Sequence, residues 1–191
     1  MLIREKIIKA YKLLEDILNQ KNIAHQKVTL VGSVATQTNI ACSDIDFVTG
    51  INYLHKEEVK SLLTQSLEFR GERIATPNTT RLLFCTKIGG IHVDLNIMEE
   101  KDYFCIIDGM MKMASELSSK QKKEIKKTKK ILKEKGKIQE YELYKNKFYQ
   151  KFCPEFLWIS DIDIIRKMAE DCLKSGTEYP KWLKDKISTG L

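Results

Sequence analysis

Proline, glycine and paired cysteines are scarce in this chain of 191 residues, which holds three prolines, nine glycines and five cysteines. With so little proline and glycine, a long disordered linker is not expected. The cysteines are odd in number, widely spaced and without a CxxC pair, so we expect reduced, mostly buried thiols, not a disulfide framework or a zinc site. No apolar run approaches the ~20 residues of a membrane span, and no apolar signal sequence stands at the N-terminus. We therefore expect an intracellular protein, cytoplasmic or nuclear, without a membrane partner.

The composition is that of a globular protein with a basic excess. Hydrophobic residues make up 42% of the chain and charged residues 31%, which is enough apolar surface for a core. The formal net charge of +7 favours contact with polyanions such as nucleic acid, although many basic proteins bind none. The length fits one domain or two small lobes.

Hydrophobic periodicity divides the chain near residue 100. Before that point the pattern predicts helices over 1–20 and 56–67, with β-strands over 28–31, 45–48, 81–86 and 92–98 and a hairpin turn at 88–91. After it, the pattern predicts a helix over 102–117 and a lysine-rich helix over 118–137 that ends at Gly136. A short strand or hairpin is expected over 138–149 and a last helix over 162–173.

Three acidic residues carry the strongest chemical signal. Asp44 and Asp46 flank Ile45, and side chains two residues apart on a strand point to the same face. Asp94 stands alone in the apolar strand 92–98, where a buried acid is costly unless it has a partner. Adjacent carboxylates repel one another unless a cation lies between them, and oxygen ligands suit Mg²⁺. If the two strands are neighbours, the three acids converge and could hold metal ions for phosphoryl transfer.

Gly32 and Ser33 end the first strand and fit the same chemistry. Glycine lets backbone N–H groups approach a phosphate closely, and the serine hydroxyl can donate as well. A lone Asp-x-Asp is most often a solvated strand edge or turn, and a lone Gly-Ser carries less information still. The combination of strand, Gly-Ser, Asp-x-Asp and a third acid in an apolar strand is what favours catalysis.

The order of these motifs resembles the DNA polymerase β-like nucleotidyltransferase superfamily. Its signature is a Gly-Ser turn, an Asp-x-Asp strand and a third acidic strand, and residues 28–98 carry the match in VGS, SDIDF and HVDLNIM. Thinner similarity to family X DNA polymerases continues through RLLFCTKIGGIHVDL (81–95), DYFC (102–105), KEKGKIQEY (133–141) and EYP (178–180). The chain is most similar to a minimal family X enzyme, which consists of a palm and a C-terminal lobe.

The resemblance implies an α+β fold: a nucleotidyltransferase palm, with a mixed β-sheet and flanking helices, over residues 1–100, and a small C-terminal α/β lobe that binds nucleotide and nucleic acid over 101–191. It implies a Mg²⁺-dependent monomer that adds dNMP to a 3′-hydroxyl in short-gap DNA repair. Asp44, Asp46 and Asp94 would hold two Mg²⁺ ions, for which Mn²⁺ can substitute, and Asp94 would act as the base. Gly32 and Ser33 would bind the phosphates of an NTP or dNTP.

Other interpretations remain open. Val34 follows Gly-Ser where family X enzymes usually carry a basic residue, so that GSVAT…SDID is more similar to the poly(A) polymerase version. A template-independent nucleotidyltransferase acting on RNA, a small molecule or a protein is one alternative, and a catalytically weak nucleic-acid-binding module is another. The Lys120–Lys137 region would contact gapped or nicked DNA in the leading interpretation, but a lysine-rich helix is often only a solvated face.

Overall fold

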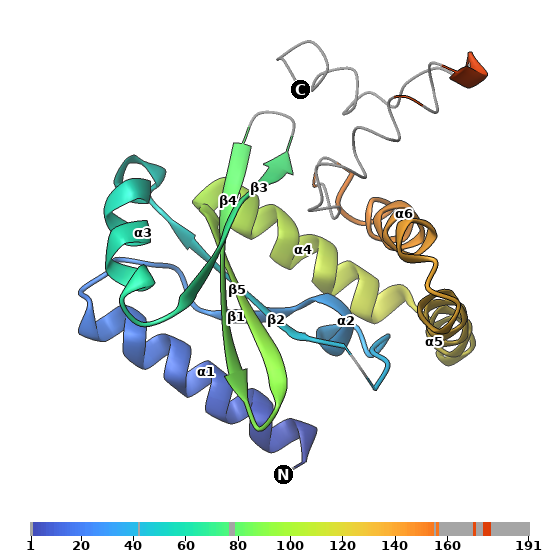
Figure 1. Cartoon of the computed structure of the whole chain (residues 1–191), viewed down its shortest axis with the longest axis horizontal. Coiled ribbons are helices and arrows are strands. Elements are labelled where there is room, and N and C mark those ends of the chain that lie inside the picture. The colour runs from blue at the N-terminus through green and yellow to red at the C-terminus, as the bar shows by residue number, and fades with distance from the viewer. Residues whose placement is uncertain are drawn as a thin grey trace.

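A five-stranded mixed β-sheet with helices on both faces forms most of the structure (Figure 1). The computed structural model describes residues 2–41, 43–76, 79–154, 156, 170 and 174–176. The α+β class predicted from the sequence is confirmed. The predicted helix over 162–173 and the EYP segment at 178–180 lie outside the described residues, apart from residue 170.

The sheet has the strand order β1-β2-β5-β4-β3. Its strands are β1 (Thr29–Val31), β2 (Ile45–Ile51), β3 (Glu68–Thr76), β4 (Thr79–Ile88) and β5 (Ile91–Glu99). The central pair, β2 and β5, is parallel, and the other three pairs are antiparallel. The pairing of β2 with β5 is decisive for the site because it aligns residues 45–51 with residues 93–99 position by position.

Alternation along the central strands sorts their side chains between two apolar cores. Phe47 and Leu95 face a core that includes Leu14 and Leu18 of α1 (Ile3–Gln20) and Leu63 of α3 (Lys56–Thr64). A short 3₁₀ turn, η1 (Tyr53–His55), leads into α3. Because successive strand residues point to opposite faces, the intervening positions face the other side of the sheet.

Helix α4 (Glu100–Glu116) covers that second face. It buries apolar side chains, among them Ile106 and Met110, against Val48 and Met98 of the sheet. Helices α5 (Ser119–Glu134) and α6 (Ile138–Tyr149) follow and lie beside the same face (Figure 1). Ser118 begins α5 with a capping box, and Gly136, at φ +64°, follows its end as predicted.

The structure confirms most of the predicted elements and corrects two. The strand or hairpin expected over 138–149 is the helix α6, in which Tyr141 and Tyr149 are buried two turns apart. The aromatic residues of this segment recur at helical spacing, and that period decides the structure. Strand β3 was not predicted, because this edge strand alternates charged residues with few apolar ones. No helix among the described residues is both long and apolar enough to span a membrane.

Candidate active site

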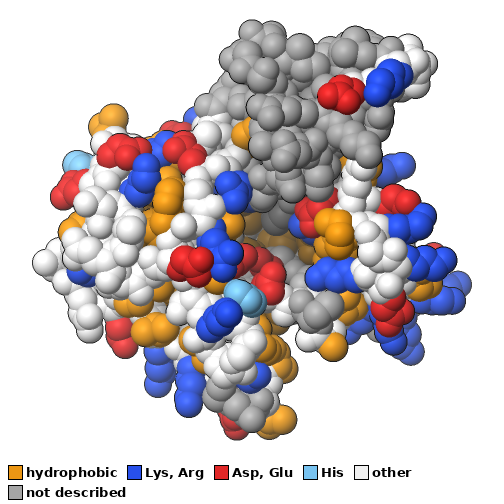
Figure 2. Space-filling model, viewed as in Figure 1, with side chains coloured by type: hydrophobic (Ala, Val, Ile, Leu, Met, Phe, Trp, Pro, Cys, Tyr) orange, Lys and Arg blue, Asp and Glu red, His pale blue; other side chains and the backbone are white. Residues whose placement is uncertain are grey.

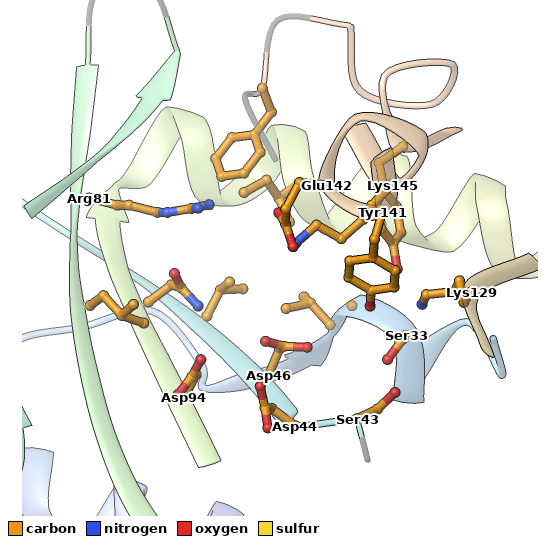
Figure 3. Close-up of a pocket in the computed structure, with 18 of the residues that line it drawn as sticks. Ser33, Ser43, Asp44, Asp46, Arg81, Asp94, Lys129, Tyr141, Glu142 and Lys145 are labelled. Carbon is orange, nitrogen blue, oxygen red and sulfur yellow. The ribbon is translucent and has the colours of Figure 1, made fainter. Parts of the chain in front are cut away.

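Three acidic side chains lie on one wall of a pocket at the face of the sheet that α4 covers (Figure 3). Asp46 of β2 pairs in register with Asp94 of β5, and Cys85 of β4 pairs with Asp94 on its other side. Asp44 stands just before β2 and lines the same pocket, which has a volume of ≈ 360 Å³. Strand alternation and the parallel register therefore place the predicted acids together.

The three carboxylates of this wall repel one another. Burial raises the pKa of Asp46 to about 7, with the negative charge of Asp94 as the second cause. The pKa of Asp94 is also raised, first by burial and then by the charge of Asp44. The positive charges of Lys145 and Lys129 lower the pKa of Asp46, but by less than burial and the neighbouring acids raise it. The wall thus favours binding of positive charge.

Gly32 brings the backbone against the acids. It begins the short helix α2 (Gly32–Ala35) with φ +68°, and a Cβ at this position would lie 2.4 Å from Oδ2 of Asp46. Ser33 is buried and lines the pocket beside it. The Thr36 hydroxyl donates to the Gly32 carbonyl at 2.9 Å, which holds the turn. Glycine is required here both for the positive φ and for the close approach.

Cations from the C-terminal helices form the opposite wall (Figure 3). Lys129 and Lys133 lie one turn apart on α5, and Lys145 comes from α6. Lys129 is 3% exposed, and its Nζ donates to the Thr38 carbonyl at 3.3 Å. Burial, followed by the charge of Lys145, lowers the pKa of Lys129 to about 8. A buried ammonium with a lowered pKa indicates a site suited to an anion.

The lysine-rich region therefore divides into two parts. Lys129 and Lys133 line the pocket, whereas many of the other lysines in this region are exposed, as Figure 2 shows over α5 and α6. The exposed lysines agree with the predicted solvated face, and contact of this helix with phosphate stays a prediction.

Aromatic and charged residues that the sequence analysis did not single out complete the pocket. Tyr141 lies between two lysines, with Lys133 Nζ 5.0 Å and Lys145 Nζ 5.8 Å from its ring centroid. Glu142 forms an ion pair with Lys145 at 2.6 Å. The helical spacing of residues 141, 145 and 149, all of which line the pocket, is the sequence pattern that could have identified Tyr141 and Lys145 as pocket residues.

Arg81 of β4 lies at another end of the pocket. It is 6% exposed, and its guanidinium carbon lies 4.9 Å from the ring centroid of Phe156. Burial lowers the pKa of Arg81 to about 10, although the charges of Asp46 and Asp94 act against this. The ring of Phe156 and the charges of Asp46 and Asp94 both favour a cation at this position.

The acids are near one another but do not enclose a single point. Among the described residues, no group of three or more His, Cys, Asp or Glu side chains is already arranged to hold a metal ion. His92, on the strand beside Asp94, has Nδ1 3.4 Å from Sγ of Cys85.

Known proteins resemble this chain only weakly. No protein-family model matches it, and no curated protein does. One solved structure, described as a cytoplasmic RNA terminal U-transferase, aligns at 12% identity with a TM-score of 0.49 and covers 68% of this chain and 40% of its own. A structure of Cid1 with its short product ApU aligns at 14% identity with a TM-score of 0.48 and the same coverage. A Cid1 poly(U) polymerase structure with Mg and 3′-dATP bound aligns at 14% identity with a TM-score of 0.43, over 60% of this chain and 36% of that one.

The chain thus spans less than half the length of each of these proteins. At such identities and TM-scores the likeness carries no argument about chemistry, and the function is inferred from the pocket itself.

Proposed function

We propose that the chain is a divalent-metal-dependent nucleotidyltransferase. One observation carries this proposal: a wall of three carboxylates faces a wall of lysines across a single pocket. The acidic wall is suited to metal ions and the basic wall to a triphosphate. A site that binds both can align a nucleoside triphosphate for attack at its α-phosphate.

The donor set fits Mg²⁺. Asp44, Asp46 and Asp94 offer only carboxylate oxygens, and burial first and repulsion between the carboxylates second raise the pKa values of Asp46 and Asp94, so a bound cation would favour their charged forms. These three residues would hold the predicted pair of ions, with side-chain adjustment to close around them. When bound, the ions would supply charge neutralisation at the phosphates and a lowered pKa for the attacking hydroxyl.

The chain's own groups account for the remaining steps. Asp94 would accept the proton of the attacking hydroxyl. The hydroxyl oxygen forms a bond to the α-phosphorus, and the bond to the β-phosphate breaks to release pyrophosphate. Ser33, Lys129 and Lys133 would hold the β- and γ-phosphates. An arriving phosphate would raise the pKa of Lys129 again by offsetting its burial.

For the acceptor, we favour the 3′ end of RNA without a template. The cations that face the acids come from α5 and α6 and not from a basic residue after Ser33, which departs from the family X pattern, and the GSVAT…SDID order is more similar to the poly(A) polymerase version. In addition, α6 replaces the strand expected for the C-terminal lobe. None of the solved structures named above is a family X DNA polymerase, so the gap-filling prediction rests on the sequence resemblance alone. The division at residue 100, with the following residues as a nucleotide-binding lobe, and the monomeric state remain part of the proposal.

A transfer assay tests the function and its acceptor together. The protein is incubated with Mg²⁺, each labelled NTP or dNTP, and single-stranded RNA, a gapped DNA duplex or no polymer. We expect untemplated addition to RNA. Template-directed filling of the gap would instead support the DNA polymerase prediction, and absence of transfer from every nucleotide to every acceptor would contradict the proposal.

A matched pair of substitutions connects the activity to the pocket. Asp94→Asn removes the proposed base and should reduce transfer by about 100- to 10,000-fold. Asp108→Asn changes an exposed acid on α4 that is paired with Lys112 at 2.7 Å, and it should leave transfer unchanged. Circular dichroism of both variants checks that the fold is kept.

A further inference from the structure

Two cysteines outside the acidic wall lie in contact. Cys105 of α4 and Cys153, which follows α6, have their Sγ atoms 3.1 Å apart although 48 residues separate them in the sequence. Both are free thiols, of which Cys105 is exposed and Cys153 is buried. A disulfide requires an S–S distance of about 2.05 Å, so a small side-chain rotation would be enough to join them.

Close packing of the backbone holds the pair together. Gly109, one helical turn after Cys105, meets the segment that carries Cys153: a Cβ there would lie 3.0 Å from the Cβ of Cys153 and 3.0 Å from the carbonyl oxygen of Phe152. Glycine therefore allows α4 to approach this segment without a gap. The Cys153 amide also donates to the Tyr149 carbonyl at 3.1 Å, which ties the segment to α6.

We propose that Cys105 and Cys153 are a redox-sensitive pair that forms a disulfide when the protein meets a peroxide. The exposed Cys105 thiolate attacks one oxygen of hydrogen peroxide, becomes a sulfenic acid and releases hydroxide. The Cys153 sulfur then attacks the sulfenic sulfur, its proton is lost, and the sulfenic oxygen leaves as water. In total, two thiols and one peroxide give one disulfide and two waters.

The third described cysteine is placed differently. Cys85 is buried on β4 beside Asp94, and its sulfur lies 3.4 Å from His92 Nδ1. Burial, followed by the charge of Asp94, raises the pKa of Cys85 to about 11. Because Cys85 is buried and its thiolate is scarce at neutral pH, Cys85 is expected to react slowly with peroxide. Burial also raises the pKa of Cys153, so within the pair the exposed Cys105 is the thiol that meets peroxide first.

The disulfide would restrict a segment at the edge of the pocket. Phe156 follows Cys153 by three residues, its amide donates to the Cys153 carbonyl at 3.3 Å, and its ring lies over Arg81. Joining Cys153 to α4 would therefore fix the start of the segment that places Phe156 beside the pocket. The proposal does not depend on the reaction that the pocket performs.

Peptide mapping of the whole protein tests the pair. Wild-type protein is treated with stoichiometric hydrogen peroxide, remaining thiols are alkylated, and a tryptic digest is analysed without reduction. We expect peptide 102–112 joined to peptide 152–166, each with a single cysteine, at a mass two hydrogen atoms below their sum. Reduction with dithiothreitol should separate them.

Cys105→Ser supplies the control, because the exposed position tolerates serine without unfolding. This variant should lose the linked peptide, and its thermal unfolding midpoint should not respond to peroxide, whereas that of the wild type should rise reversibly. Overoxidation of Cys105 to a sulfinic acid without a link, a link to another cysteine, or the same midpoint shift in Cys105→Ser would overturn the proposal.

Discussion

Replacing Asp46 with asparagine should stabilise the metal-free protein while abolishing its proposed activity. Asparagine keeps the shape of the side chain and removes its charge. The pKa of Asp46 rises from 3.8 to about 7 on folding, through burial first and the charge of Asp94 second. The ionised carboxylate therefore destabilises the folded chain above pH 7 by up to about 4 kcal/mol. This figure is an upper limit, because water in the pocket screens a partly exposed carboxylate.

The destabilisation depends on pH in one direction. Below about pH 3 the carboxyl group is mostly protonated in both states, and folding costs almost nothing at this position. As the pH rises towards 7, the unfolded chain releases the proton while the folded chain retains it, so the free energy of unfolding falls. At pH 5 about a third of the full effect applies, and at pH 8 all of it does.

Urea unfolding in the presence of EDTA at pH 5 and pH 8 measures this effect. Asp46→Asn should exceed the wild type by up to about 4 kcal/mol at pH 8 and by up to about 1.5 kcal/mol at pH 5. Asp108→Asn, at the exposed ion pair on α4, should show no comparable dependence on pH. An Asp46→Asn variant no more stable than the wild type at pH 8, or a difference that does not change with pH, would refute the reasoning.

Three further predictions concern the phosphate side of the site. Gly32→Ala and Gly90→Ala should each lower the free energy of unfolding by about 1–2 kcal/mol, because alanine disfavours a positive φ. Only Gly32→Ala places a Cβ against Asp46, so only this variant should lose transfer, and equal activity of the two variants in the transfer assay would contradict this. Lys129→Met should raise the KM for nucleoside triphosphate about 10- to 100-fold, while Lys130→Met, at an exposed pair, should not; steady-state kinetics that show no difference between them would remove Lys129 from the phosphate site. Glutamine in place of three exposed lysines of α5, Lys120, Lys123 and Lys127, should weaken binding of single-stranded RNA. The slope of log affinity against log salt should fall by about 0.7 per lysine removed. An unchanged slope in a filter-binding titration would show that this face is only solvated.

The acidic wall could be predicted because it follows from short-range rules. Strand alternation places Asp46 on the face opposite Phe47, and an acid within the apolar strand 92–98 indicates a functional position. The parallel register that sets Asp94 directly beside Asp46 could only be assumed, since strand pairing joins distant parts of the chain.

The basic wall could not be predicted residue by residue. In a helix with lysine at half of its positions, the lysine that is buried depends on how α5 rotates against the sheet, and packing of Ile125 sets that rotation. On α6, the prediction of a strand or hairpin was wrong, because the aromatic residues have the spacing of a helix. The contact between Cys105 and Cys153 arises from tertiary packing at Gly109, and nothing in the spacing of the cysteines indicates it.

The central claim is that three carboxylates, on two neighbouring strands and just before one of them, hold divalent metal at the pocket. A crystal structure grown with Mn²⁺ and a non-hydrolysable nucleoside triphosphate tests it most directly. The account predicts anomalous density within about 2.2 Å of carboxylate oxygens from Asp44, Asp46 and Asp94, with the triphosphate extending towards Ser33 and Lys129. Manganese bound elsewhere, or an Asp94 carboxylate turned away from a metal held by the other two, would contradict it.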